Sequence, residues 1–206
     1  TGEAWSNMSG IRRLLRITAT MAKDIFYKSR WRIGVIDRPI HEVRSEDIAD
    51  VVWLEPMQDS MSMADPFGFT DGGREYILFE EYEPPHNVGR IAAIEYMGDG
   101  NYRRLPDPFT ENTHMSYPFV IKDDSDIFLI RENIRASDIE MFRLTDMKVC
   151  EKIAIVNDFT ATDPSVVFYR GKWWIFCTRA DNLECEILYI FHSESLTDGW
   201  KPHAGN

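Results

Sequence analysis

Acidic side chains recur at matching places in three similar segments of the chain. Each segment contains a proline, at position 66, 118 or 164, and the residues before these prolines are Asp65, Tyr117 and Asp163. The residues fourteen positions after them are Glu80, Glu132 and Thr178. Carboxylates bind hydroxyl groups and can act as general acids and bases, and aromatic faces stack on the C–H surfaces of pyranose rings. The pattern predicts a pocket for a sugar if the fold brings the three segments together.

The three segments share a hairpin pattern. They begin at Ala64, Ser116 and Thr162 and read ADPFGFTDGGREYILFEE, SYPFVIKDDSDIFLIREN and TDPSVVFYRGKWWIFCTR. An apolar run leads through an Asp-, Gly- or Ser-rich turn into a second run of aromatic and β-branched residues, which predicts two antiparallel strands. A further β-like pair follows each hairpin, and four strands per unit of about 40–50 residues are typical of a β-propeller blade. An immunoglobulin-like sandwich gives no reason for the repeated proline hairpin.

The sequence therefore predicts an all-β fold of the propeller type. Three units do not close a ring, because propellers usually have about four to eight blades. Extra strands are predicted at 31–36 and 51–54, and an N-terminal strand of this kind often completes the last blade. Because the chain also begins with Thr, we expect it to be part of a longer protein with an incomplete ring.

Net charge divides the chain into two predicted parts. Of the net charge of −11, residues 1–32 contribute +5 and the remainder −16. The basic part has apolar residues at three- and four-residue steps, which predicts an amphipathic helix over 1–30, followed by the propeller domain over 31–206. The helix could pack on its own acidic domain or lie on a membrane surface or a partner. The acidic balance argues against a nucleic-acid partner, and no apolar run is long enough for a membrane span.

In a propeller the innermost strand of each blade lines a central funnel, so equivalent positions should lie near one another. Asp65, Glu132 and Asp163 are therefore candidate catalytic residues. Candidate substrate-binding residues are Glu80, Glu81, Arg90, His114, Ser116, Tyr117, Arg131 and Trp173. Structural roles remain open for several: a strand start for each Asp-Pro, a solvated rim for the paired glutamates, an ion pair for Glu132, and core packing for Trp173.

The sequence does not contain the motifs of metal, phosphate-binding or serine-hydrolase sites. The five histidines show no metal-ligand spacing, so we expect no metal, and no other cofactor is predicted. No phosphate-binding Gly-rich loop or Gly-x-Ser-x-Gly motif occurs. Three cysteines do not describe a disulfide framework, and the N-terminal segment is not a secretory signal; we expect a cytoplasmic location.

An ordered set of short motifs carries a resemblance to a known family. The motifs are Trp31-x-Ile-Gly, Ala64-Asp-Pro-Phe67, Phe79-Glu-Glu81, Gly89-Arg-Ile-Ala92, His114-x-Ser-Tyr-Pro-Phe119, Asp163-Pro, Gly171-Lys-Trp-Trp174 and Trp200-x-x-His203-x-x-Asn206. Together they resemble the N-terminal domain of plant glucosamine inositolphosphorylceramide transferases and its bacterial relatives. That domain is similar to the five-bladed propellers of arabinanases, xylosidases, levansucrases and invertases. The resemblance covers about residues 31–206 and implies a five-bladed type of propeller, of which about three to four blades are present here.

The resemblance also implies roles for three residues. The glycosidase relatives use an Asp of the first blade as base or nucleophile, a second Asp as an orienting residue, and a Glu as acid. By position these roles fall to Asp65, Asp163 and Glu132. The sequence departs from the pattern at Ser116-Tyr117, where the hydrolases commonly have Asp, and in the blade order of Glu132 and Asp163. If Asp65 and Glu132 are the two catalytic residues, the distance between their carboxyl groups indicates the stereochemistry. A distance of about 5–5.5 Å implies that the anomeric configuration is retained, and one of about 6.5–9.5 Å that it is inverted.

Three functions follow as hypotheses. The first is a carbohydrate-active enzyme, most simply a glycoside hydrolase acting on a glycan or glycoconjugate. The second is a non-catalytic sugar-recognition domain of a formyl- or glycosyltransferase-type protein, and the third is a platform for protein interactions. The recurring acidic and aromatic positions favour the first two.

Overall fold

The computed structural model describes residues 30–58, 61–83, 88–180 and 187–206. The chain divides into two compact units, Thr1–Trp31 and Arg32–Asn206. The basic helix expected over 1–30 lies almost wholly outside the described residues. The described residues belong almost entirely to the second unit.

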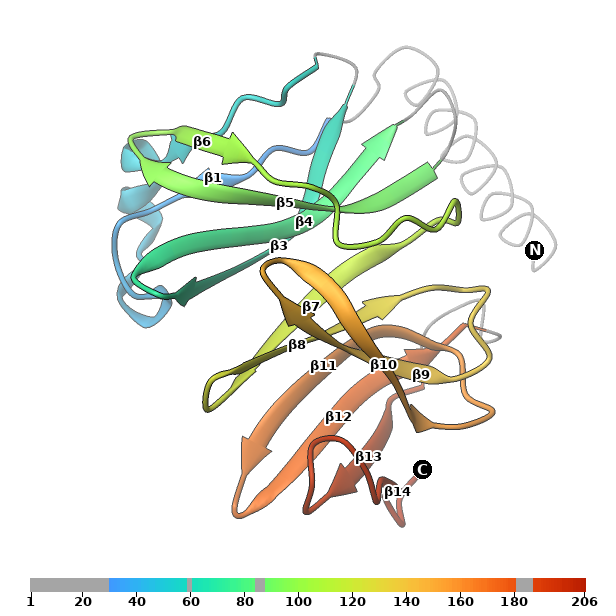
Figure 1. The fold of residues 1–206 in the computed structure, drawn as a ribbon. Coiled ribbons are helices and arrows are strands. Elements are labelled where there is room, and N and C mark those ends of the chain that lie inside the picture. Colours follow the sequence, from blue (N-terminus) through green and yellow to red (C-terminus); the bar gives the residue numbers. More distant parts are fainter. Residues whose placement is uncertain (1–29, 59–60, 84–87, 181–186) are drawn as a thin grey trace, which may run out of the picture. The chain divides into compact units, whose positions relative to one another are not determined.

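Three four-stranded antiparallel sheets make up most of this unit (Figure 1). The first contains β3 (Ser62–Asp71), β4 (Arg74–Glu83), β5 (Val88–Gly98) and β6 (Asn101–Arg104). The second contains β7 (Ser116–Asp123), β8 (Asp126–Glu132), β9 (Ile139–Thr145) and β10 (Lys148–Val156). The third contains β11 (Ala161–Tyr169), β12 (Lys172–Arg179), β13 (Tyr189–Ser193) and β14 (Lys201–Pro202). Each sheet is a meander in chain order, so the predicted four-stranded repeat is confirmed.

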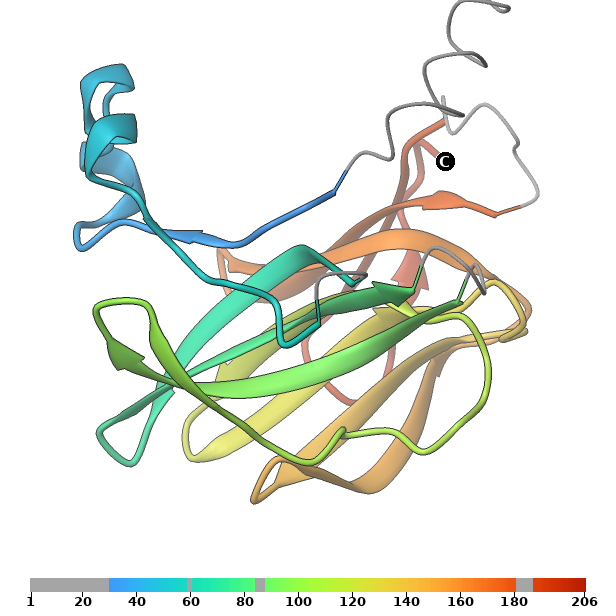
Figure 2. The same ribbon diagram turned by 90° about the horizontal axis from the view of Figure 1, so that it is seen from above.

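Apolar side chains between successive sheets form the core. One cluster joins the first and second sheets through Leu78, Ile91, Leu129 and Phe142, all almost completely buried. Another joins the second and third sheets through Ile130, Met141 and Ile175. The first strands of the sheets also meet, because β7 contacts both β3 and β11. The sheets consequently follow one another in chain order, with their first strands together (Figure 2).

The segment before the first sheet forms a small cap. β1 (Gly34–Val35) pairs with β2 (Val52–Trp53), and between them lie two 3-10 helices, η1 (Ile40–Glu42) and η2 (Ser45–Asp50). Ile33 and Leu54, which flank these strands, pack in the core with Phe79 of β4. Among the described residues, β1 pairs with β2 and its neighbours pack on the first sheet. Completion of a last blade by this N-terminal strand stays a prediction.

The repeated prolines mark an irregularity in the first strand of each sheet. Regular pairing is interrupted between Ala64 and Phe67, between Ser116 and Phe119, and between Thr162 and Ser165. The residue before each proline has a left-handed backbone, with φ of 47° at Asp65, 49° at Tyr117 and 50° at Asp163. A residue before proline normally prefers an extended backbone, and a left-handed backbone is uncommon for residues other than Gly. These bulges therefore hold strained residues and redirect their side chains.

Backbone strain at the third bulge can be measured with three substitutions of Asp163. Asp163→Gly relieves the left-handed strain, Asp163→Asn removes only the charge, and Asp163→Val places a β-branched residue at positive φ. We expect the free energy of unfolding, from urea titrations, to fall in the order Gly, Asn, Val, with Val at least about 1–2 kcal/mol below Asn. Equal stability of the Val and Asn variants would contradict the strained conformation.

Candidate functional site

The bulges bring a glutamate beside each of the first two strained residues. Glu80 of β4 lies opposite Ala64, and Glu132 of β8 lies opposite Ser116. In the third sheet the equivalent pair is Thr162 and Thr178. The fourteen-residue spacing seen in the sequence is thus the register of the first hairpin in each sheet.

Four carboxyl groups from the three sheets influence one another: Asp65, Glu80, Glu132 and Asp163, here called the inner carboxylate cluster. Burial raises the pKa of Glu80 to about 7, and the charges of Asp65 and Glu132 add to this effect. Burial also raises the pKa of Glu132 to about 7; a hydrogen bond from the Asp163 backbone opposes the rise, and the charges of Asp163 and Asp65 reinforce it. The Asp163 N–H donates to Glu132 Oε2 at 3.3 Å. Burial and the Asp65 charge raise the pKa of Asp163 as well.

The inner carboxylate cluster places two glutamates with a pKa of about 7 beside two aspartates. Glutamates with a pKa near 7 remain partly protonated at neutral pH and can donate a proton. A neighbouring aspartate can serve as base, nucleophile or hydrogen-bond acceptor. The cluster therefore contains the groups that acid–base chemistry on a glycosidic bond requires.

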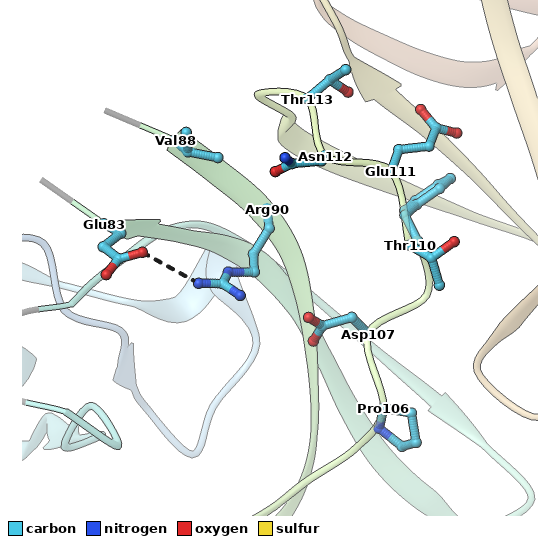
Figure 3. Close-up of a pocket in the computed structure, with 10 residues that line it drawn as sticks. Glu83, Val88, Arg90, Pro106, Asp107, Thr110, Glu111, Asn112 and Thr113 are labelled. Atoms are coloured by element: carbon cyan, nitrogen blue, oxygen red, sulfur yellow. Dashed lines mark ion pairs between the residues drawn. The ribbon is translucent and has the colours of Figure 1, made fainter. Parts of the chain in front are cut away.

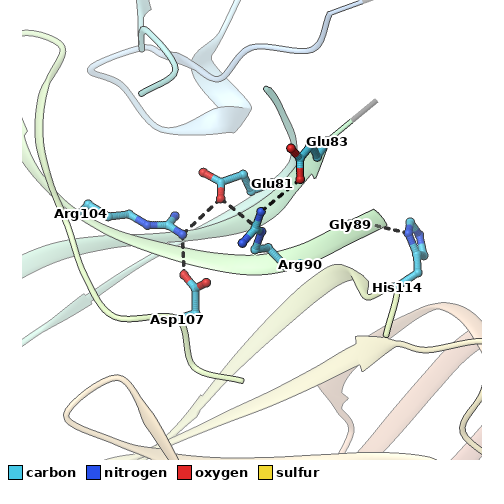
Figure 4. A network of polar contacts seen from close by, with 7 residues as sticks. All are labelled: Glu81, Glu83, Gly89, Arg90, Arg104, Asp107 and His114. Carbon is cyan, nitrogen blue, oxygen red and sulfur yellow. Dashed lines mark hydrogen bonds and ion pairs between the residues drawn. The ribbon is translucent and has the colours of Figure 1, made fainter. Parts of the chain in front are cut away.

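His114 faces the cluster through Glu80. Its Nδ1 accepts a hydrogen bond from the Gly89 N–H at 2.8 Å (Figure 4), and its Nε2 lies 3.8 Å from Glu80 Oε1. Because Nδ1 is an acceptor, a neutral His114 carries its proton on Nε2, on the side of Glu80. Gly89 is essential to this approach: a Cβ placed there would lie 2.1 Å from Glu80 Oε1 and 2.9 Å from His114 Cε1.

Half-buried aromatic rings adjoin the cluster on β3 and β7. The Phe67 ring centroid lies 5.1 Å from those of both Tyr117 and Phe119. The Tyr117 hydroxyl shares a hydrogen bond of 2.8 Å with Ser165 Oγ, which links the second and third bulges. Ser116, next to Tyr117, is buried. These rings provide apolar surface of the kind that stacks on a sugar.

Glu81 and Arg90 lie on the opposite face of the first sheet from Glu80. Consecutive residues of a strand point to opposite faces, and Glu81 pairs with Arg90 across β4 and β5. Arg90 Nε lies 3.6 Å from Glu81 Oε2, and Arg104 Nη2 lies 3.3 Å from the same oxygen (Figure 4). The structure does not bring these two predicted residues into the inner carboxylate cluster.

Arg131 and Trp173 also lie away from the cluster. The Arg131 side chain is 2% exposed; it pairs with Glu111 at 2.9 Å, and its guanidinium lies 4.7 and 4.9 Å from the ring centroids of Phe109 and Phe142. Trp173 pairs with Phe168 beside the β11–β12 turn and packs on the core. Trp173 lies five positions before Thr178 on β12, a distance of about 17 Å along a strand.

The sequence did not identify Gly89, which allows Glu80 and His114 to approach closely, or Phe67 and Phe119, which pack with Tyr117 and with each other. Gly89 had a usable signal, because a glycine in an apolar strand often marks a close approach of another group. The two phenylalanines had none, since an inner-strand aromatic is indistinguishable from a core residue in sequence. Within the described ranges, no group of three or more His, Cys, Asp or Glu residues could hold a metal ion, and no helix could cross a membrane.

Comparison with solved structures shows which kind of fold the chain has. The chain has a β-propeller fold of the glycoside-hydrolase type. It is similar to an exo-β-1,3-galactanase from Clostridium thermocellum, with a TM-score of 0.62, 14% identity, and coverage of 78% of this chain and 41% of that one. A GH62 α-L-arabinofuranosidase from Coprinopsis cinerea gives a TM-score of 0.56 and 12% identity over 73% of this chain and 53% of that one.

Comparison of the sequence with known protein families shows the family to which the chain belongs. Residues 51–206 match the family described as glucosamine inositolphosphorylceramide transferase 1, N-terminal, and the chain belongs to that family. The relatives include glucosamine inositolphosphorylceramide transferase 1 from Oryza sativa subsp. indica, 30% identical over 154 residues, and from Arabidopsis thaliana, 25% identical over 149 residues. These matches cover 70% of this chain and 20% of each relative, so the chain spans about a fifth of their length. The family resemblance seen in the sequence is confirmed.

The raised pKa of Glu80 predicts a pH-dependent stability. A carboxyl group whose pKa rises from 4.5 to about 7 on folding binds its proton more tightly in the native state. Its stabilising effect is therefore present at low pH and is lost as pH rises through about 4.5 to 7. We expect Glu80→Gln to be more stable than the wild type at about pH 8, by on the order of 2 kcal/mol, with the difference shrinking towards about pH 5. Urea titrations across this range measure it.

Glu75→Gln provides the matched control, because Glu75 is an exposed glutamate on the same strand. If the stability difference between Glu75→Gln and the wild type varied with pH as that of Glu80→Gln does, burial of Glu80 would not be the source of the pH dependence.

The close approach at Gly89 predicts that a methyl group cannot be accommodated. Gly89→Ala should displace Glu80 or His114 and lower the free energy of unfolding by about 1–3 kcal/mol. Gly68→Ala is the control within the same sheet, since its nearest contact would be Tyr76 O at 3.8 Å. Comparable stability of the two variants, measured by urea titration, would refute the packing around Gly89.

Proposed function

We propose that this domain binds a glycan or glycoconjugate at the inner carboxylate cluster and acts on a glycosidic bond there. The observation that carries the proposal is the raised pKa, about 7, of Glu132, beside Asp163 and under the charge of Asp65. A general acid needs a pKa near the operating pH, and its partner must remain ionised. Glu132 is the proposed acid, Asp65 the proposed base or nucleophile, and Asp163 the residue that orients Glu132.

Substrate contacts in this proposal come from the surrounding side chains. Glu80 and His114 would bind sugar hydroxyls, because a carboxyl and an imidazole N–H supply an acceptor and a donor. Phe67 and Tyr117 would offer their rings to the C–H face of the sugar. The solved structures of similar fold are named as galactanase and arabinofuranosidase, which makes neutral plant-type glycans the first substrates to test.

The ring in this proposal is of the five-bladed type, with the three sheets as successive blades and the rest supplied from outside this sequence. Support comes from the solved relatives, of which the matched region is 41–53%. Large apolar side chains on β11 are also exposed, with Phe168 at 55% and Tyr169 at 56%. A further blade would cover them.

A binding role without hydrolysis is the second candidate. It is favoured by Tyr117, which occupies the second bulge where Asp65 and Asp163 occupy the others, so that one carboxylate is missing. In this version the domain recognises a sugar for a transferase-type protein, in keeping with the names of its relatives. The aromatic contacts of Tyr117 serve binding in either version.

Substrates with different leaving groups test the proposed chemistry. A nitrophenolate leaves without much help from an acid, whereas a sugar alcohol must be protonated as it leaves. We expect Glu132→Gln to retain most activity on nitrophenyl arabinofuranoside, xyloside or galactoside, and to lose about 10²–10⁴-fold on the matching oligosaccharides. Asp65→Asn should lose activity on both kinds.

Control variants and a binding assay separate the alternatives. Glu75→Gln should behave as the wild type. If no substrate is cleaved but a glycan array shows binding that Asp65→Asn removes, the recognition role replaces the hydrolase. Absence of both cleavage and binding in the wild type would overturn the carbohydrate function.

A further inference from the structure

A groove lies outside the inner carboxylate cluster. Here called the interblade groove, it has a volume of about 730 Å³ and lies between the ends of β4 and β5, at Glu83, Val88 and Arg90, and the segment 106–113 (Figure 3). That segment connects the first and second sheets. The volume is in the range of about 300–1,000 Å³ typical of small-molecule sites.

Charges around the groove are already paired. Arg90 Nη2 lies 3.6 Å from Glu83 Oε2, and Arg131 Nη2 lies 2.9 Å from Glu111 Oε2. Arg104 pairs with Asp107. A phosphate or carboxylate would have to displace a carboxylate from its guanidinium, and an amine would have to displace a guanidinium. The groove thus favours an uncharged ligand.

Uncharged hydrogen-bonding groups line the same groove. Thr110 and Asn112 are exposed, and Asn112 points toward the strand that carries Arg90 (Figure 3). An amide offers both a donor and an acceptor, and a threonine hydroxyl can donate or accept. Ligands with many hydroxyl groups match this lining.

The wall of the groove packs on the core. Phe109 packs edge-on against Phe142 with ring centroids 4.9 Å apart, and the Arg131 guanidinium lies 4.7 Å from the Phe109 ring. The side chain of Arg131 is itself 2% exposed, so the segment is anchored in the core. A preformed wall reduces the entropy cost of binding a weakly interacting ligand.

We infer that the interblade groove is a second binding site, for a neutral oligosaccharide. The site is separate from the inner carboxylate cluster, because Arg90 and the cluster residue Glu80 lie on opposite faces of the first sheet. It therefore stands whether or not the cluster cleaves a glycosidic bond.

Three neutral probes test the inference on the full chain: cellotriose, xylotriose and β-1,3-galactotriose. We expect at least one of them, at millimolar concentration, to slow hydrogen exchange in the segment 106–113. Asn112→Trp, which fills the groove, should weaken this binding by at least about tenfold in calorimetry. Glu75→Trp, which introduces the same side chain at an exposed position outside the groove, should remain within about twofold of the wild type.

Several results would overturn the inference. These are no protection of the segment by any of the three sugars, unchanged binding in Asn112→Trp, or stronger protection by inorganic phosphate than by the sugars. Loss of binding in Glu132→Gln but not in Asn112→Trp would place the sugar in the cluster alone. The exchange measurement on the wild type decides the question even if Asn112→Trp does not fold.

Discussion

Mutual repulsion among partly buried carboxyl groups is the interaction on which the site depends. Asp65, Glu80, Glu132 and Asp163 come from three different sheets, and separation of those sheets would relieve their repulsion. The apolar clusters between the sheets oppose this separation, because opening them would expose side chains such as Ile91, Leu129 and Ile175 to water. The hydrophobic core thus maintains an arrangement of charges that is unfavourable by itself.

The alternation of side chains along one strand divides the polar chemistry of the first sheet. Glu80 belongs to the inner carboxylate cluster, and Glu81, its neighbour, belongs to the ion pairs of Arg90 and Arg104 on the other face. Gly89 and Arg90 repeat this division on β5, with His114 above the glycine and Glu83 beside the arginine. Two polar sites can therefore lie close together in sequence while the sheet separates them.

The sequence predicts the sheets well because each hairpin carries its own turn and strand signals, and the proline repeat locates the inner strands. It also identifies Asp65 and Asp163 as one set of equivalent positions and Glu80 and Glu132 as another, because equivalence is a matter of spacing. It does not predict the position of Arg131 or Trp173, because a strand pattern alone does not say which face or which end meets a neighbouring sheet. The left-handed backbone before each proline runs against local preference, so only packing by the whole sheet reveals it.

The bulges limit which amino acids can evolve at three positions of the site. Asp, Asn and Gly tolerate a left-handed backbone better than other residues, so Asp65 and Asp163 can lose their charge in one substitution without disturbing the sheet. A tyrosine does not favour a left-handed backbone, so the contacts of the Tyr117 ring and hydroxyl group explain its presence at the second bulge. The backbone of the first and third bulges therefore does not itself require a charged side chain, whereas the aromatic residue at the second bulge depends on the contacts of its ring and hydroxyl group.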